Sequence, residues 1–205
     1  MAFHIRRANV QDAGPLLQIY APYVQDTTVT FEFDVPSEDE FAARIEHALA
    51  SYTWLVLEHV DRAGDTAEDE PQAIGYAYYS PLGERAAYQW SAETSIYLDR
   101  GWCDRGLGAQ LLEVLESCMA AQGICTSEAC ITSENTGSME FHRRHGYTEC
   151  ARFTSCANKF DRWLSTVWME KQLAPYGKNP HPVAPLAPDT LDAILVRANE
   201  RLGEL

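Results

Sequence analysis

The stretch from Tyr88 to Leu112 constrains the fold most strongly, because the spacing of its apolar side chains changes once along it. Over Tyr88–Leu98, apolar and polar residues alternate, which is typical of a strand with one buried face. From Leu107 onward, apolar residues recur every three or four positions, which predicts one face of a helix. The stretch therefore predicts a strand, a turn and a helix, with Gly106 and Gly108 where the helix begins.

This glycine turn is compatible with a phosphate group. A helix that begins here exposes unpaired backbone amides and the positive end of its dipole. Glycine also lets a ligand approach the backbone closely. The turn lacks the Lys-Ser/Thr of a Walker motif and does not read GxGxxG. The spacing alone leaves two interpretations open. The turn is either a phosphate site or an ordinary helix N-terminus that contains two glycines.

Composition narrows the possible functions. A length of 205 residues predicts one domain with an extension, and 46% hydrophobic residues are enough for a core. The net charge of −14 argues against binding to nucleic acid or to an anionic membrane. We expect a cytoplasmic protein, because no apolar run approaches a membrane span and the N-terminus lacks a signal-peptide core. The six cysteines show no metal-ligand spacing, so we interpret them as reduced thiols and predict no metal.

The first part of the chain predicts two helices and three strands. Asn9 or Asp12 can cap the first helix, and Ser37 with Glu40 forms a capping box for the second. Residues 27–33 are β-branched and aromatic, which is typical of either an extended loop or a short strand. The predicted strands are Phe3–Arg7, Trp54–His59 and Ala73–Ser80, with Asp61–Pro71 as a loop between the last two.

After the central helix, the chain predicts three more strands and one short helix. The short helix follows Asn135 and ends near Gly146, which suits a helix C-cap. The predicted strands are Ser127–Thr132, Tyr147–Thr154 and Trp163–Leu173, with Ser155–Arg162 as the loop between the last two.

The C-terminal part has a different composition. Five prolines after Ala174 predict an extended linker, and Asp189 can cap an amphipathic helix that follows it. The apolar side of that helix can bury against its own domain or against a second copy of the chain. We therefore predict a domain over residues 1–173, followed by a Pro-rich linker and a C-terminal amphipathic helix over residues 174–205.

This order of elements predicts a mixed α/β (α+β) sheet flanked by helices. A glycine turn after the fourth strand, with a later asparagine–histidine motif, resembles the GNAT N-acetyltransferases over about residues 3–173. Further motifs are similar to the phosphinothricin and methionine sulfone (sulfoximine) acetyltransferase branch. The asparagine–histidine motif is Asn135-x-x-Ser138-x-x-Phe141-His142-x-x-x-Gly146-Tyr147, and the branch motifs are Thr27–Phe31, Tyr88-x-Trp90-x-Ala92-Glu93, and Lys159 with Trp163.

The resemblance implies a mostly antiparallel sheet of about seven strands, splayed after the fourth. It also implies transfer of an acetyl group from acetyl-CoA to a primary amine, without a metal. The amine must first lose its proton, because an ammonium has no lone pair with which to attack. Glu93 matches the branch's general base, and partial burial would raise its pKa toward a useful value. His142 matches the position of the proton donor for the leaving thiolate. The alternatives are a solvated strand glutamate and a packed helical histidine.

The resemblance assigns the acetyl-CoA contacts mainly to backbone groups. An N–H near Ile96 would stabilise the thioester oxygen, and the amides of the glycine turn would hold the pyrophosphate. Cys103 departs from the family's turn pattern, and Asp104 adds a negative charge that would weaken binding unless Arg105 offsets it. The implied cofactor-binding residues are Ile96, Tyr97, Leu98, Asp104, Arg105, Gly106, Leu107, Gly108, Ala109, Asn135 and Arg144.

The sequence predicts the binding site of the acceptor amine less precisely than that of acetyl-CoA. Thr30, Phe31, Tyr78, Tyr88 and Trp90 could line a small pocket, and core packing is the alternative for each aromatic. Two residues in the last predicted loop and strand differ from the sequence pattern of the branch. The sequence therefore predicts the class of the amine, a small amino acid or analogue, but not which one. The resemblance also implies a homodimer. Other functions compatible with the sequence are acetylation of protein N-termini and a non-catalytic acyl-CoA sensor.

Overall fold

The computed structural model describes residues 2–60 and 71–203, and contains one seven-stranded sheet in the order β1-β2-β3-β4-β5-β7-β6. Neighbouring strands are antiparallel except β4 and β5, which are parallel. This architecture confirms the predicted mixed, mostly antiparallel sheet. The strands are β1 (Ala2–Arg7), β2 (Trp54–Val60), β3 (Gln72–Pro81), β4 (Ser91–Leu98), β5 (Thr126–Thr132), β6 (Thr148–Lys159) and β7 (Arg162–Gln172).

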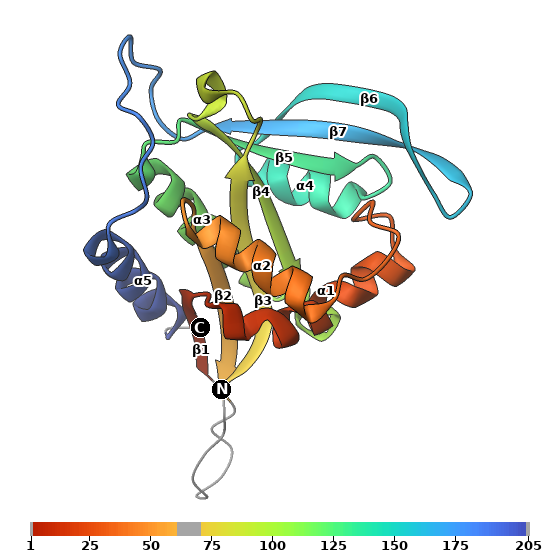
Figure 1. The fold of residues 1–205 in the computed structure, drawn as a ribbon, viewed down its shortest axis with the longest axis horizontal. Helices are drawn as coiled ribbons and strands as arrows, with labels where there is room; N and C mark the ends of the chain where they lie inside the picture. Colours follow the sequence, from red (N-terminus) through yellow and green to blue (C-terminus); the bar gives the residue numbers. More distant parts are fainter. Residues whose placement is uncertain (1, 61–70, 204–205) are drawn as a thin grey trace, which may run out of the picture.

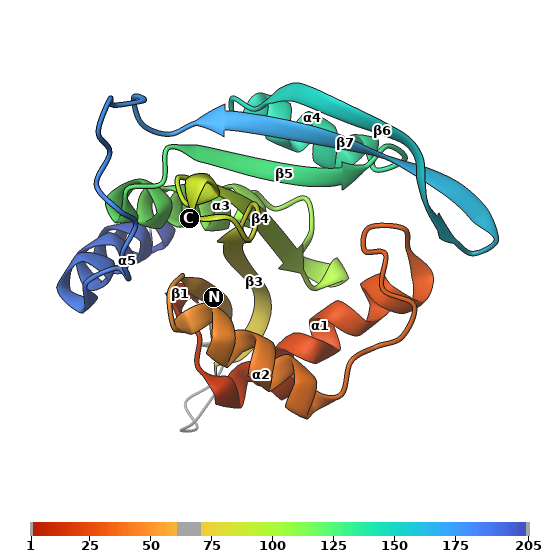
Figure 2. The same cartoon turned by 45° about the horizontal axis from the view of Figure 1, so that its top comes forward.

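Helices cover both faces of the sheet (Figure 1). Two helices, α1 (Ala13–Asp26) and α2 (Glu38–Leu49), pack against one face of β2–β4. On the other face lie α3 (Leu107–Gln122), α4 (Thr136–Arg144) and α5 (Pro188–Leu202). The β6–β7 hairpin extends beyond the rest of the sheet in both views (Figures 1 and 2). Over residues 2–60 and 71–203, each helix is too short or too polar to be a membrane span.

Local signals correctly predicted the start of α2. The Ser37 side chain accepts a hydrogen bond from the Glu40 amide at 3.2 Å, and the Glu40 carboxylate accepts one from the Ser37 amide at 2.8 Å. Asn9 caps a short 3-10 helix, Val10–Asp12, which leads into α1. Residues 27–33 form a loop rather than a strand. The predicted loop Asp61–Pro71 lies outside the described residues, apart from Pro71.

Three predicted element boundaries were wrong. Tyr88–Trp90 precedes β4, because the Tyr88 and Gln89 amides bond locally to Arg85 and Ala86 instead of to a neighbouring strand. The predicted loop Ser155–Arg162 is mostly strand, since β6 and β7 are joined by a tight turn at Phe160 and Asp161, both at positive φ. Helix α5 begins at Pro188 after Ala187, so Asp189 lies inside its first turn and does not cap it.

The C-terminal helix packs on its own domain. The side chains of Leu191, Ala198 and Leu202 are buried in the core shared with α3 and β1. The Asn199 side chain accepts a hydrogen bond from the Ile5 amide at 2.7 Å and donates one to the Ile5 carbonyl at 2.9 Å. These bonds satisfy the outer edge of β1, which would otherwise present free backbone groups. Of the two alternatives for this apolar face, the structure supports burial within the same chain.

The sheet opens where β4 and β5 separate. The two strands pair only through Ser91–Glu93 and Thr126–Glu128. The next residue, Thr94, uses its hydroxyl to donate a hydrogen bond to the Glu128 carbonyl at 3.0 Å. Beyond this point β4 pairs only with β3. The predicted splay after the fourth strand is therefore confirmed.

Candidate active site

A cavity of about 520 Å³ lies in the opening between β4 and β5. Its walls are residues 94–98 of β4, residues 129–131 of β5, the start of α3 and one side of α4. The cavity brings together Ile96, Tyr97 and Leu98 with Asp104, Gly106, Gly108, Ala109, His142 and Arg144, all of which were predicted site residues. The separation of the strands thus creates the space in which a ligand can meet these groups.

The exposed edge of β4 suits an extended ligand. Because β5 leaves after Glu93, the backbone groups of Ile96 on this edge have no ladder partner on β5. Buried backbone polar groups require hydrogen-bond partners, so an amide-containing chain can pair here as an added strand does. The Leu98 carbonyl already accepts a 2.6 Å hydrogen bond from the Tyr23 hydroxyl. Tyr23 also lines the cavity, a role that the sequence analysis did not predict.

The glycine turn presents free amides to the same cavity. Gly106 has a φ of 78° and is the N-cap of α3. Its carbonyl accepts the first helical hydrogen bonds, from Ala109 at 3.1 Å and Gln110 at 3.4 Å. The amides of Leu107 and Gly108 precede these bonds, and within the described residues they have no backbone acceptor. This is the geometry of an anion site at a helix N-terminus.

Two side chains of the turn modify its charge. Asp104 lines the cavity and has a φ of 60°, which is unfavourable for a residue with a side chain. The Arg105 guanidinium lies over the Trp102 ring, 4.7 Å from its centroid, and forms no ion pair with Asp104.

Burial raises the pKa of the Cys103 thiol, so it remains protonated near neutral pH. A covalent role for Cys103 is correspondingly disfavoured.

Helix α4 supplies the opposite wall. The Asn135 side chain caps this helix by accepting a hydrogen bond from the Ser138 amide at 3.1 Å, and it does not line the cavity. Arg144 lines the cavity and pairs with Glu140 at 3.0 Å. His142 is buried, which lowers its pKa, and its Nδ1 lies 2.8 Å from the Ser138 carbonyl. Because a carbonyl only accepts, Nδ1 carries the proton and Nε2 of the neutral ring does not.

Glu93 lies at the point where the two strands separate. It is the last residue of β4 that pairs with β5, and its side chain is half-buried. Within the described residues, its carboxylate makes no hydrogen bond and no ion pair. Burial raises the pKa of this carboxylate above its ordinary value. An unpaired carboxylate with a raised pKa beside a cavity has the properties of a proton acceptor.

The predicted acceptor residues are not all together. Tyr78 lines a second cavity of about 240 Å³ between the sheet and the α1–α2 pair, and Glu93 is among the groups that raise its pKa, after burial. The Thr30 hydroxyl is 2.7 Å from that of Tyr20, which lines the same cavity. Phe31 follows in the adjoining loop and lines neither cavity. Tyr88 and Trp90 lie in the turn before β4, where the Trp90 indole donates to the His181 carbonyl at 2.9 Å.

Sequence comparison places this arrangement among known proteins. Residues 5–168 match the family model described as "Acetyltransferase (GNAT) domain". The chain is 32% identical over 176 residues to the L-methionine sulfoximine/L-methionine sulfone acetyltransferase of Pseudomonas aeruginosa, covering 85% of this chain and 97% of the relative. It is 28% identical over 174 residues to the phosphinothricin N-acetyltransferase of Streptomyces coelicolor, covering 82% and 95% respectively.

Solved structures agree with these relatives. A GNAT superfamily phosphinothricin acetyltransferase from Sinorhizobium meliloti, in complex with acetyl-CoA, superposes with a TM-score of 0.78 at 30% identity, over 93% of this chain and 98% of that one. A putative acetyltransferase from Salmonella typhimurium with acetyl-CoA gives 0.78 at 26% identity, over 87% and 98%. The motifs, the splayed sheet and these matches agree, and the chain belongs to the GNAT acetyltransferase family.

Proposed function

We propose that this protein transfers the acetyl group of acetyl-CoA to the primary amine of a small amino acid or analogue, of the phosphinothricin or methionine sulfone class. The amine attacks the thioester directly, with Glu93 as the general base. The observation that carries this proposal is the unpaired, half-buried Glu93 carboxylate where β4 and β5 separate. The names of the relatives and the acetyl-CoA complexes of similar structures support the substrate classes.

The residues around the larger cavity fit acetyl-CoA. The free edge of β4 at Ile96–Leu98 can pair with the amides of the pantetheine arm, and a β4 amide near Ile96 can donate to the thioester oxygen. The amides from Asp104 to Ala109 can bind the pyrophosphate, with Leu107 and Gly108 contributing through their backbone. Arg144 supplies a cation at the cavity wall. The Asn135 side chain caps the start of α4, and this helix forms one wall of the cavity.

The proton route uses two groups. Glu93 removes the proton from the incoming ammonium. Burial raises the pKa of the Glu93 carboxylate, which makes it a stronger base than an exposed glutamate. His142 lies in the wall of the same cavity as the β4 edge. Its ring is neutral before the reaction, with Nε2 free to accept. We propose that His142 accepts at Nε2 the second proton, which the nitrogen loses after it has attacked the thioester, and passes this proton to the leaving thiolate.

The smaller cavity fits the side chain of a single amino acid. Its volume of about 240 Å³ is below the range of about 300–1,000 Å³ that is typical of drug-sized ligands. Its walls are largely aromatic, and the Arg44–Glu32 ion pair lies among its lining residues. Ser80, which lines this cavity, is in register with Glu93 on the neighbouring strand. Thr30 and Phe31 lie in the adjoining loop. We therefore assign the acceptor side to this region rather than to Tyr88 and Trp90.

Replacing Asp104 with Gly should tighten acetyl-CoA binding. The change removes a negative charge beside the proposed pyrophosphate site, and glycine adopts the φ of 60° without strain, so the turn is kept. A gain of about 1 kcal/mol corresponds to a dissociation constant about fivefold lower. Isothermal titration with acetyl-CoA measures it. Asp161→Gly is the matched control, because Asp161 also has a positive φ, of 57°, but lies in the β6–β7 turn away from the cavity. Equal dissociation constants for the wild type and Asp104→Gly would contradict this effect.

A turnover assay tests the proposed function. Purified protein and acetyl-CoA are incubated with common amino acids, methionine sulfone, phosphinothricin and short peptides, and the free thiol released is measured. Strong turnover with one small amino acid or analogue is the expected result. Turnover only with peptides would indicate acetylation of protein N-termini instead. Acetyl-CoA binding without turnover on any amine would indicate a sensor, and absence of binding would remove acetyl-CoA as the donor.

We also propose that the protein is a cytoplasmic homodimer. All six cysteines, each within the described part of the chain, are free thiols, as is usual in a reducing compartment. The protruding β6–β7 hairpin exposes three large apolar side chains, Phe153, Phe160 and Trp163, the last of them 71% exposed, and we assign the dimer contact to this hairpin. Sedimentation equilibrium should show a dimer that Trp163→Glu weakens and Val196→Glu, on α5, does not. A monomeric wild type would refute the dimer.

A further inference from the structure

Three glutamates form a row across the sheet. Glu93 on β4 is in register with Glu128 on β5, and Glu128 is in register with Glu170 on β7. Residues in register on neighbouring strands point to the same face, where like charges destabilise the sheet. In the described part of the chain, no lysine, arginine or histidine forms an ion pair with any of the three. The negative charges of this row are therefore not balanced by ion pairs with positive side chains.

A negative charge costs the most free energy at Glu128, because the side chain of Glu128 is buried. Glu128 is 7% exposed, and among the residues that the structure describes its side chain has one hydrogen-bond partner, the Cys150 thiol, at 3.9 Å. A thiol has one proton, and the Cys150 sulfur is closer to the Trp168 carbonyl, at 3.4 Å. Within the described residues, the carboxylate therefore has one long contact to a shared thiol proton and no second side-chain donor. Buried charges are usually paired with an opposite charge or bound to a metal ion.

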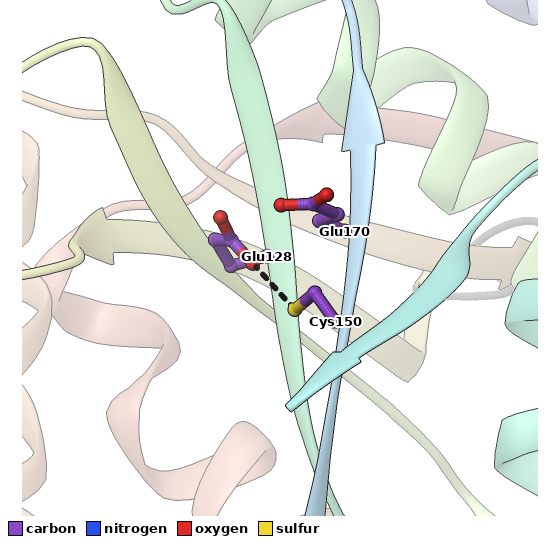
Figure 3. Close-up of side chains that lie close together, drawn as sticks. All are labelled: Glu128, Cys150 and Glu170. Atoms are coloured by element: carbon purple, nitrogen blue, oxygen red, sulfur yellow. Dashed lines mark hydrogen bonds between the residues drawn. The ribbon is translucent and has the colours of Figure 1, made fainter. Parts of the chain in front are cut away.

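A bulge in β6 directs Cys150 toward this carboxylate. Glu149 pairs with Met169 and Ala151 with Trp168, so Cys150 is the extra residue between two consecutive pairs. Bulges commonly reorient a side chain at a functional site. The side chains of Glu128, Cys150 and Glu170 point toward one another from three adjacent strands (Figure 3). One ligand atom from each lies within 4.8 Å of the other two.

We propose that Glu128, Cys150 and Glu170 form a binding site for a zinc-type divalent metal ion. A thiolate with two carboxylates suits Zn²⁺, whereas Mg²⁺ and Ca²⁺ prefer ligand sets made only of oxygen. Zn²⁺ binds sulfur at about 2.3 Å and carboxylate oxygen at about 2.0–2.2 Å, so small side-chain rotations bring the three groups to bonding distance. Binding forms one Zn–S and two Zn–O bonds and releases the thiol proton to solvent. A water molecule completes four-coordination.

This site is separate from the proposed acetyl transfer, which uses no metal. Glu93 is in register with Glu128 but is not among the three ligands. The sequence alone does not group these residues, because they are 22 and 20 residues apart along the chain and only the strand order β5-β7-β6 brings them together. No short ligand spacing marks such a set.

Equilibrium dialysis and cobalt spectroscopy test the proposal. Tag-free, chelator-treated protein is dialysed against Zn²⁺, and one ion per chain is expected. Cys150→Ser should weaken binding by about tenfold or more, whereas the matched control Cys156→Ser, another exposed cysteine on β6, should not. With Co²⁺, a thiolate-to-metal charge-transfer band should appear in the wild type and Cys156→Ser and be absent from Cys150→Ser.

Two further measurements make the test decisive. Glu170→Gln keeps the shape of an exposed side chain and should also weaken Zn²⁺ binding by about tenfold, which covers the case in which Cys150→Ser fails to fold. Circular dichroism checks the folding of each variant. The proposal is wrong if the wild type binds no stoichiometric Zn²⁺, if the charge-transfer band persists in Cys150→Ser, or if Glu170→Gln binds as tightly as the wild type.

Discussion

Glu93→Gln should lower kcat by about 10²–10⁴-fold, because glutamine is nearly the same size but cannot accept the proton of the attacking ammonium. The dissociation constant for acetyl-CoA should not change, since Glu93 does not line the larger cavity. Steady-state kinetics with the best amine of the panel measure the first quantity, and isothermal titration measures the second.

Glu149→Gln is the control for this substitution. Glu149 is an exposed strand glutamate on β6 that pairs with Arg152 at 3.2 Å, so its loss should leave kcat within about twofold of the wild type. If Glu93→Gln retains the wild-type kcat, Glu93 is not the base. If it loses acetyl-CoA binding as well, its role is structural.

Leu202→Ala should destabilise the protein by about 2–5 kcal/mol, which is the range for truncating a buried leucine. The Leu202 side chain is 2% exposed and belongs to the core beneath α5, which also includes α3 and β1. Val196 lies on the same helix but is 57% exposed, so Val196→Ala should change the free energy of unfolding by no more than about 0.5 kcal/mol. Urea unfolding of both variants measures the difference.

The same experiment separates burial within the chain from burial between chains. Packing within one chain gives a loss that does not depend on protein concentration, whereas a contact between two copies gives a loss that grows on dilution. A concentration-dependent loss for Leu202→Ala would contradict the packing of α5 on its own domain.

Local signals were reliable where each residue's role depends on its near neighbours. The Ser37–Glu40 capping box, the three- and four-residue spacing after Leu107, and the alternation within β4 all predicted their elements correctly. Each is a consequence of the 3.6-residue turn of a helix or the two-residue repeat of a strand, which are properties of the backbone itself.

Local signals failed where a distant partner decided the outcome. Phe160 and Asp161 adopt positive φ in the β6–β7 turn, although neither is glycine. The long ladder between these strands stabilises that turn, and a short sequence window does not contain the ladder. Tyr88–Trp90 has a strand-like alternation but precedes β4, because the Tyr88 and Gln89 amides bond locally to Arg85 and Ala86.

The sequence by itself determined the order of the elements, the position of the glycine turn and the placement of Glu93 on the polar face of a central strand. These follow from short-range periodicity and from motifs that resemble a family. Only the tertiary structure decided that β4 and β5 part after Glu93, that α5 covers its own domain, and that Glu128, Cys150 and Glu170 meet. The physical reason is that strand pairing and burial join residues far apart in the chain, and no local pattern specifies which partner each one meets.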